Sequence, residues 1–328
     1  MTTDLTGPLP PALVRDVESL RALLDLVVPA KTVDRNLLIG TWNLKAFGGL
    51  TKKWAAEPGD PTQRDLHALR LIAEVVSRFD VTAIQEVRED LTAARALMEL
   101  LGPNWGFIVT DVTRGSAGNN ERLGFVFDRR RLVPSGLTAE LVVPTDESGI
   151  KEGAFDRQFA RTPYAVSFDA GGTEFILVTL HVLYGARSSD RVPELRAISK
   201  WMADWARSPH AWSTNLIVLG DFNIDRADDP LYEAFVSGGL QVPADLMEAP
   251  RSIFGGGKFY DQIAWFMEST SPTAPPALTM RYQGGGYVDF PDVVYLDMPR
   301  AQIQWRLSDH YPLWSEFECL DRRSGLAL

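Results

Sequence analysis

Acidic, amide and histidine side chains recur in this 328-residue chain at the points where apolar, strand-like runs end. The clearest case is the segment LIVLGDFNID, residues 216–225, whose apolar run leads into Asp221 and Asn223. Oxygen ligands suit Mg²⁺ and a neutral amide donates hydrogen bonds to phosphoryl oxygens, so this turn suits a hard cation or a phosphate. Similar apolar runs end at or near Asn43, Glu86, His181, Asp261 and the triplet Ser308-Asp309-His310.

Acting together, these side chains could hydrolyse a phosphoester. Polar groups that cannot be buried unpaired gather where strand ends form one rim. A carboxylate such as Glu86 would hold a divalent cation that polarises a phosphoryl oxygen. The imidazole of His310 could take a proton from water near neutral pH, and Asp261 is a candidate to hold its second nitrogen. Taken singly, each residue has a simpler interpretation, as a solvated loop acid or a hydrogen-bonded structural histidine.

The elements that must position these residues begin with an amphipathic helix over residues 11–28, interpreted as docked on the main domain rather than as a membrane or partner helix. A helix from about Asp60 to Phe79 is expected between two buried strands. Strands in the middle of the chain follow one another without helices, which implies antiparallel pairing. The expected strands are 36–42, 81–84, 107–110, 123–127, 137–143, 164–168, 174–180, 216–219, 261–266 and 313–317, and the other expected helices are 92–101, 192–207 and 230–236.

The bulk properties exclude several classes of protein. Hydrophobic residues make up 45% of the chain, enough for a substantial core, and no apolar run has the length of a membrane span. We expect residues 1–35 to form an N-terminal extension and residues 36–328 to form one catalytic domain. The net charge of −10 argues against a passive coat on DNA, because a polyanion would have to meet a local basic surface or metal ions. A single cysteine and the lack of a secretory signal favour a cytoplasmic location.

The motifs TWNL, IQEV, LVTLH, LGDFN, YDQIAW and LSDH follow one another from about residue 37 to 318. This ordered set resembles the endonuclease/exonuclease/phosphatase superfamily, and within it the pancreatic-type deoxyribonuclease branch. The resemblance implies an α/β fold, a four-layer sandwich of two mixed, largely antiparallel β-sheets with helices on the outer faces. It also implies a Mg²⁺-dependent phosphodiesterase, with Mn²⁺ as an alternative metal and with DNA as the expected substrate of an endonuclease.

The resemblance assigns the metal and the nucleophile to particular residues. Mg²⁺ would be held at Glu86, with Asn43 beside it, and Asp309 would assist metal or phosphate binding. Asp221 and Asn223 would orient the attacking nucleophile and hold the phosphate.

The resemblance also assigns the two histidines. His310, paired with Asp261, would be the general base. His181, oriented by Glu121, would stabilise the phosphoryl oxygen or protonate the leaving group.

Substrate contacts and departures from the branch come from the same comparison. Arg161 would clamp a phosphate, and Arg88 would reach toward nucleic acid. The chain cannot form the disulfides of the secreted enzymes, and Asn119 stands where the branch has a groove-binding aromatic. Other basic residues that could face a nucleic-acid backbone are Lys45, Lys52, Lys53, Arg114, Arg122 and Arg187.

The segment between residues 225 and 260 is long, rich in glycine and unlike the branch. Substrate choice depends on such loops, so two alternatives stay open: an enzyme for a lipid or small-molecule phosphoester, and a non-catalytic binding protein. Ile253-Phe254 is the one candidate for a lipid-contacting hairpin. We expect nucleic acid as the partner and no stable membrane association, and no protein partner can be inferred.

Overall fold

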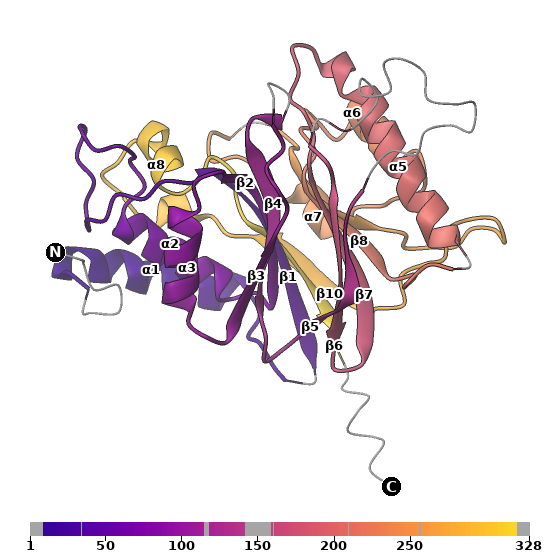
Figure 1. The fold of residues 1–328 in the computed structure, drawn as a ribbon, viewed down its shortest axis with the longest axis horizontal. Coiled ribbons are helices and arrows are strands. Elements are labelled where there is room, and N and C mark those ends of the chain that lie inside the picture. The colour runs from indigo at the N-terminus through magenta and orange to yellow at the C-terminus, as the bar shows by residue number, and fades with distance from the viewer. Residues whose placement is uncertain are drawn as a thin grey trace, which may run out of the picture.

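Two β-sheets pack face to face in the computed structural model (Figure 1). The described residues are 9–33, 35–114, 118–141, 159, 161–208, 210–255 and 257–319. The first sheet has six strands, in the order β10 (Tyr282–Tyr287), β11 (Leu313–Glu318), β1 (Asn36–Phe47), β2 (Val81–Arg88), β4 (Glu121–Asp128) and β3 (Trp105–Val109). The second sheet has five, in the order β5 (Val133–Glu140), β6 (Tyr164–Ala170), β7 (Thr173–His181), β8 (Leu216–Asp221) and β9 (Asp261–Trp265).

Helices cover the outer face of each sheet (Figure 1). Those beside the first sheet are α1 (Pro11–Val27), α2 (Leu66–Val76), α3 (Thr92–Leu101) and α8 (Arg300–Arg306). Those beside the second are α5 (Val192–Arg207) and α6 (Pro230–Val236). The short elements are α7 (Ala244–Glu248) and the 3₁₀ helices η2 (Ser188–Asp190) and η3 (Phe290–Asp292). The α/β sandwich expected from the sequence is confirmed.

Strand β1 shows why the first sheet is buried on both faces. Side chains alternate across a strand, so Leu37 and Ile39 join the core between the two sheets, whereas Leu38 and Trp42 join the core beneath the helices. Such a continuous apolar run is typical of a strand covered on both sides.

The pairing pattern brings strand ends to one edge of the sandwich. The pairs β3–β4, β5–β6 and β6–β7 are antiparallel, as predicted for the middle of the chain. The pairs β1–β2 and β7–β8 are parallel, and each is connected through a helix, α2 or α5. Parallel neighbours end at the same edge, so the residues that follow them lie close together.

Several predicted boundaries are wrong. The helix expected from Asp60 begins only at Leu66, because the Asp65 carboxylate caps it by accepting from the Ala68 N–H at 2.8 Å. Strand β5 is Val133–Glu140 rather than 137–143, and residues 142–143 lie outside the described residues. Strand β1 extends past the expected end at residue 42.

Five elements had no prediction: β10, α7, α8 and the 3₁₀ helices η2 and η3. The sequence of β10, YQGGGY, has no alternating pattern because three glycines fill its centre. It is held as a strand by antiparallel pairing with β11 at the edge of the first sheet. Helices α7 and α8 are too short to show a helical period.

The N-terminal helix α1 packs on α2 and contributes Val17, Leu20 and Leu24 to the same core. Arg21 on α1 forms a two-pronged ion pair with Glu74 on α2, at 2.8 and 2.7 Å. The division into an extension and a catalytic domain at residue 36 stays a prediction. No helix in the described part of the chain combines the length and the apolar character that a membrane crossing requires.

Candidate active site

Three neighbouring strands of the second sheet place an acid or a histidine in one row. The parallel register of β7 and β8 sets His181 beside Asp221, and the antiparallel register of β8 and β9 sets Asp221 beside Asp261. Gly220 makes this approach feasible: its φ is +138°, and a Cβ there would lie 2.2 Å from the Leu180 carbonyl oxygen. The glycine of the LGDFN motif therefore has a backbone role.

The first sheet brings a second group to the same edge, from the ends of β1 and β2. The ladder between these strands is irregular after Asn43, and Lys45, Ala46 and Glu86 have positive φ values of 37°, 49° and 60°. Such conformations are costly for residues with side chains and concentrate at functional sites. Here the bent backbone aims the Ala46 N–H at the Glu86 carboxylate, 2.7 Å away.

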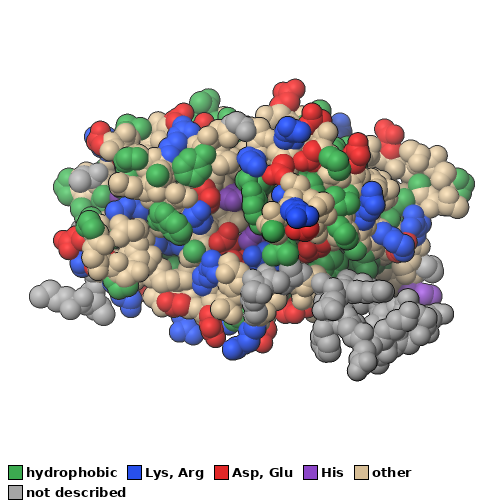
Figure 2. Space-filling model, turned by 90° about the horizontal axis from the view of Figure 1, so that it is seen from above, with side chains coloured by type: hydrophobic (Ala, Val, Ile, Leu, Met, Phe, Trp, Pro, Cys, Tyr) green, Lys and Arg blue, Asp and Glu red, His purple; other side chains and the backbone are tan. Residues whose placement is uncertain are grey.

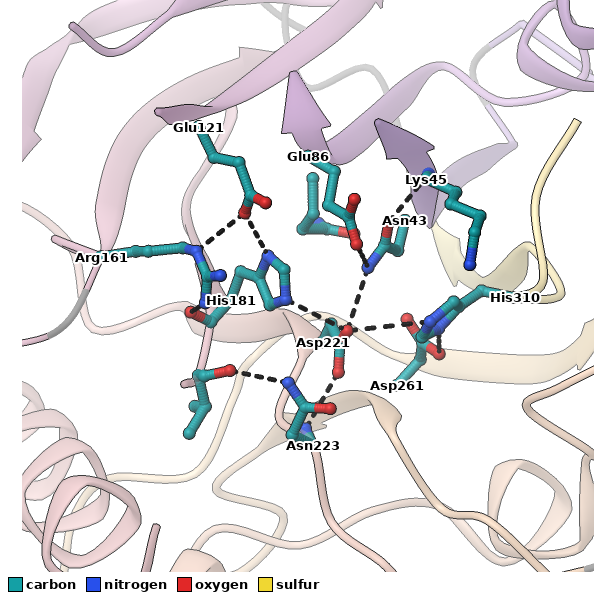
Figure 3. Close-up of polar contacts among 12 residues, drawn as sticks. Asn43, Lys45, Glu86, Glu121, Arg161, His181, Asp221, Asn223, Asp261 and His310 are labelled. Atoms are coloured by element: carbon teal, nitrogen blue, oxygen red, sulfur yellow. Dashed lines mark hydrogen bonds and ion pairs between the residues drawn. The ribbon is translucent and has the colours of Figure 1, made fainter. Parts of the chain in front are cut away.

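Asp221 occupies the centre of the site (Figure 3). Its Oδ2 atom lies 3.0 Å from Asn43 Nδ2, 3.5 Å from His181 Nε2 and 3.9 Å from His310 Nε2. Its Oδ1 atom accepts the Asn223 N–H at 2.9 Å. Asp221 thus connects the residues contributed by the two sheets.

His310 forms a buried pair with Asp261, with Nδ1 2.6 Å from Oδ2. Burial raises the pKa of Asp261 to about 6, even though His310 acts in the opposite direction. Burial also opposes the charge on His310, but the attraction of Asp261 and Asp221 outweighs it, so the pKa of His310 is raised. The backbone is fixed as well: Trp42 Nε1 donates to the His310 carbonyl at 2.9 Å.

His181 belongs to a second buried cluster. Its Nδ1 lies 2.9 Å from Glu121 Oε2, and the same oxygen lies 2.7 Å from Arg161 Nε. Burial disfavours the charged imidazole, but the bond to Glu121 and the charge of Asp221 raise the pKa of His181. Arg161 also lies 3.4 Å, through Nη1, from the His181 carbonyl oxygen.

Glu86 is the carboxylate best suited to a divalent cation. Burial opposes its ionisation, but His181, the Ala46 N–H and the Asn43 amide lower the pKa of Glu86 to about 2. Its hydrogen-bond donors are neutral, with Asn43 Nδ2 at 3.1 Å, and among the described residues its only ion-pair partner is Arg88 at 3.7 Å. An ionised oxygen donor whose closest contacts are neutral N–H groups fits Mg²⁺ or Mn²⁺.

The residues expected to assist the metal lie differently. Asn43 contacts Glu86 directly, whereas Asp309 forms an ion pair with Lys45, Oδ2 to Nζ 2.7 Å. Glu121 and His181 also lie near Glu86, with candidate ligand atoms of all three within 4.8 Å of one another. Glu121 is already neutralised by Arg161 and His181, so Glu86 is the better metal ligand of the three.

Asn223 and Arg88 complete the set expected from the sequence. Asn223 has a φ of +50° and donates through Nδ2 to the Val182 carbonyl at 2.7 Å. Arg88 lies at the rim, where Nη1 donates to the Asn119 carbonyl at 2.6 Å and Nη2 lies 3.5 Å from Glu121 Oε1. Asn119 itself donates to Glu121 at 2.5 Å, so it supports the His181 cluster instead of offering a stacking surface.

Three buried arginines in the site were not identified from the sequence. Arg64 donates to the carbonyls of Leu44, Lys45 and Ala46 and also to that of Leu307. It therefore ties the bent end of β1 to the segment that leads into Ser308-Asp309-His310. Burial lowers the pKa of Arg64 to about 10, which still leaves it charged.

The other two arginines hold loops of the second sheet. Arg191 donates to the Asn223 carbonyl and pairs with Asp225 at 3.0 Å. Arg251 donates to the Asp261 carbonyl at 2.6 Å. In the sequence each resembles an ordinary surface charge, and the missing signal is burial, which depends on the tertiary fold.

The site opens at one face of the molecule. Figure 2 shows histidine side chains in a hollow near the middle of this face, with acidic side chains beside them and basic and hydrophobic side chains around the hollow. A substrate can therefore reach the histidines from solvent, although His181 and His310 are only 6% and 8% exposed.

Two mixed sheets with acids and histidines gathered at one edge define a class of phosphoester hydrolase. The family model of the endonuclease/exonuclease/phosphatase family matches residues 40–310, so the chain belongs to this family. Its members hydrolyse phosphoester bonds and generally depend on a divalent metal. The family expected from the motifs is confirmed.

The chain is also similar to individual curated proteins and solved structures. A deoxyribonuclease of Thioalkalivibrio sp. strain K90mix is 24% identical over 314 residues, 90% of this chain and 75% of that protein. Chicken (Gallus gallus) deoxyribonuclease-1 is 26% identical over 213 residues, 62% of this chain and 67% of its own. The fold also matches a Bacteroides thetaiotaomicron mannosyl-6-phosphatase, with a TM-score of 0.53 and 17% identity over 86% of this chain and 99% of that one.

Proposed function

We propose that the protein is a divalent-metal-dependent endonuclease that hydrolyses phosphodiester bonds in DNA. The observation that carries this proposal is the position of the Asp221 carboxylate between the Nε2 atoms of His181 and His310, at 3.5 and 3.9 Å. Each imidazole is held from behind by its own carboxylate. Hydrolysis needs one group to accept a proton and another to donate one, and this pair of dyads offers both.

In the proposed reaction a water molecule attacks phosphorus while His310 Nε2, in its neutral form, accepts the water proton. Asp261 holds the His310 ring in the required orientation and stabilises the imidazolium that forms. Asp221 orients the water between the two rings. As the bond from phosphorus to the leaving oxygen breaks, His181 Nε2 donates a proton to that oxygen.

Amide and guanidinium groups would hold the phosphate. The Asn223 side-chain amide donates one N–H to the Val182 carbonyl and keeps the other for a phosphoryl oxygen. The Asn43 amide donates to Asp221 and Glu86, so it can turn to a phosphoryl oxygen only by giving up one of these bonds. Arg161 uses Nε and Nη1 within the protein, so its proposed phosphate contact falls to Nη2. Arg88, at the rim, would contact the nucleic acid beyond the scissile phosphate.

A metal would be held mainly by Glu86, with Asn43 beside it. When bound, Mg²⁺ or Mn²⁺ would neutralise charge that develops on the phosphoryl oxygens. Asp309 Oδ2 is held by the ion pair with Lys45, so Asp309 would share in this site through Oδ1 or after that ion pair opens.

DNA is favoured over a lipid or small-molecule phosphoester by the relatives, which are named deoxyribonucleases. The fold alone does not decide, because it is also that of a mannosyl-6-phosphatase. Basic side chains near the site also favour a polyanion. Arg88 lies 3.7 Å from Glu86, and Lys45 pairs with Asp309, the residue before His310. Lys258 lies over the ring of Tyr260, which in turn contacts the His310 ring.

The test is a comparative hydrolysis assay on plasmid DNA, RNA, phospholipid and sugar phosphates, each with Mg²⁺ and with Mn²⁺. We expect wild-type protein to nick the plasmid and His310→Ala protein to leave it intact. Intact DNA and RNA in both metals would contradict the proposal. Release of phosphate or a phosphorylated head group, with DNA untouched, would select the alternative substrate class.

A further inference from the structure

Aromatic side chains gather at the mouth of the candidate active site. Among the described residues, the aromatic side chains that stand out as exposed are Tyr184 (52%), Trp212 (52%), Phe254 (53%) and Trp305 (50%). Trp212 is bonded to Glu174, at the start of β7, and is thus roughly 20 Å along that strand from His181. The other three are all connected to the site. Singly scattered exposed rings need no explanation, but three exposed rings on segments linked to one site make a candidate binding surface.

Tyr184 stands on the wall formed by the second sheet, in the loop after β7. Its ring meets the Tyr260 ring edge-to-face at 6.4 Å, and the Tyr260 ring lies 5.7 Å from the His310 ring. The buried Arg191 places its guanidinium carbon 4.8 Å from the centre of the Tyr184 ring. Tyr184 is therefore supported from within the protein while half of its surface faces solvent.

Trp305 stands on the wall formed by the first sheet, in α8. Lys45 Nζ lies 4.8 Å from the centre of its ring and 2.7 Å from Asp309 Oδ2. The indole thus stands next to the residues that precede His310. Phe254 follows a segment that is tied to the same residues, since Ser252 is bridged to His310 and the Ile253 N–H donates to the Asp309 carbonyl at 3.0 Å.

The Tyr184 and Trp305 rings are each accompanied by a cation, and this pairing distinguishes the class of ligand. A lipid surface would require a continuous apolar patch, whereas these rings lie on separate walls beside Arg191 and Lys45. A nucleic-acid strand presents bases and phosphates in alternation, so the two rings can meet bases while the partly exposed Lys45 and Arg88 meet phosphates. The buried Arg191 is bonded within the protein and only supports the Tyr184 ring. With a net charge of −10, the protein must attract a polyanion through such local cations.

We infer that Tyr184 and Trp305 stack on unpaired nucleobases that flank the scissile phosphate, so the preferred substrate is single-stranded rather than fully paired DNA. In a duplex the bases stack on one another and their faces are not available, whereas an unpaired base offers a free face to an aromatic ring. This inference rests on the proposed nuclease function and specifies its substrate.

The test measures cleavage and binding separately. The substrates are a single-stranded oligonucleotide, its blunt duplex, and a single strand in which the nucleotides around one scissile phosphate lack bases. We expect wild-type kcat/KM to be higher on the single strand than on the duplex. Tyr184→Ala and Trp305→Ala should each lower kcat/KM on the single strand by about 5- to 150-fold, the contribution of one stacked base.

Two further variants keep the result specific. Trp212→Ala removes an equally exposed aromatic far from the site and should behave as wild type. Tyr184→Phe retains the ring and should recover most of what Tyr184→Ala loses, as expected if the ring face carries the contact. On the base-free strand the alanine variants should lose nothing relative to wild type, because no base is present to stack. Fluorescence anisotropy with the labelled single strand in EDTA measures the same loss as affinity, independently of catalysis.

The inference fails if Tyr184→Ala and Trp305→Ala bind and cleave the single strand as wild type does, or if the base-free strand is affected equally. It also fails if the variants keep their DNA affinity but lose binding to phosphatidylserine–phosphatidylcholine vesicles, since the rings would then serve a lipid surface. Failure of the nuclease proposal looks different: wild-type protein would bind the single strand through the rings without cleaving it.

Discussion

His310 and His181 lie on either side of the Asp221 carboxylate, and each directs its Nδ1 toward a buried acid. The two acids differ in their surroundings. Glu121 Oε2 contacts Arg161 as well as His181, and Oε1 accepts from Asn119. Asp261 contacts His310 through Oδ2, whereas its Oδ1 is buried without a hydrogen-bond partner in the described part of the chain.

This difference indicates how the two histidines can divide the work. The charge of Glu121 is fixed by a guanidinium that cannot lose its proton. The charge of Asp261 is compensated chiefly by His310, since Arg251 bonds to the Asp261 backbone carbonyl and not to the carboxylate. A carboxylate that has no other cationic partner gives the greatest electrostatic stabilisation to its imidazole when that imidazole becomes charged. His310 is therefore the better proton acceptor, and His181 is left to donate.

The largest expected effect is the loss of activity on replacing either histidine, and a change of leaving group distinguishes the proton acceptor His310 from the proton donor His181. His310→Gln and His181→Gln should each lower kcat on DNA by about 10²- to 10⁴-fold, the usual contribution of general acid–base catalysis. On a p-nitrophenyl phosphodiester the loss should persist for His310→Gln and largely disappear for His181→Gln. The reason is that p-nitrophenolate departs without a proton.

Steady-state kinetics on both substrates, with Trp212→Ala protein as a folded control, measure this difference. Equal losses for the two variants on both substrates would contradict the division of roles. A loss on the p-nitrophenyl ester for His181→Gln alone would reverse it.

A second prediction concerns stability. Glu121→Gln leaves the buried Arg161 without its acid, and removal of one partner from a buried ion pair costs about 3–5 kcal/mol of unfolding free energy. Asp261→Asn should cost less, about 1–3 kcal/mol. The substitution removes the main attraction that raises the pKa of His310, so the imidazole can become neutral whereas Arg161 keeps its charge. Urea unfolding in EDTA at pH 7 compares the two variants.

The ordering of these two losses is the informative result. If Asp261→Asn is as destabilising as Glu121→Gln, then the electrostatic difference between the two dyads is smaller than the contacts indicate. Arg161→Met in the Glu121→Gln background provides the matched control, since it removes the stranded charge and should recover part of the stability.

The site residues near the ends of strands can be predicted from the sequence, but the buried residues that hold them in place cannot. His181 and Asp221 were predicted as site residues from their positions after apolar runs, and Asp261 from its position at the start of one. The structure brings the three into one row. The row itself depends on strand register, which one sequence does not show. Arg64 and Arg251 escaped prediction because their bonds go to backbone carbonyls distant in sequence or in irregular loops.

The same limit explains the errors in the fold. Strand β10 contains three consecutive glycines and exists through its pairing with β11. The positive φ of Glu86 likewise has no local sequence signal, since it arises where β1 and β2 bend at the edge of the sheet. Side-chain chemistry could be predicted, but the backbone geometry that aims it required the tertiary structure.

The smallest expected effect concerns Arg88, which lies between the Glu121 cluster and the metal acid. Its Nη2 is 3.5 Å from Glu121 Oε1 and 3.7 Å from Glu86 Oε2, and the side chain is 29% exposed. For Arg88→Ala we expect an unfolding free energy within about 1 kcal/mol of wild type. KM for DNA should rise with kcat nearly unchanged, and the slope of log KM against log salt should fall by about 1, as for one lost phosphate contact.

Arg207→Ala, on the outer helix α5, is the matched control and should change neither slope nor KM, because Arg207 pairs with Asp204 away from the site. A fall in kcat for Arg88→Ala comparable to that of His181→Gln would assign Arg88 a different role. It would then act through Glu121 on the His181 dyad, so that two arginines, and not Arg161 alone, fix the charge that distinguishes this dyad from the His310 pair.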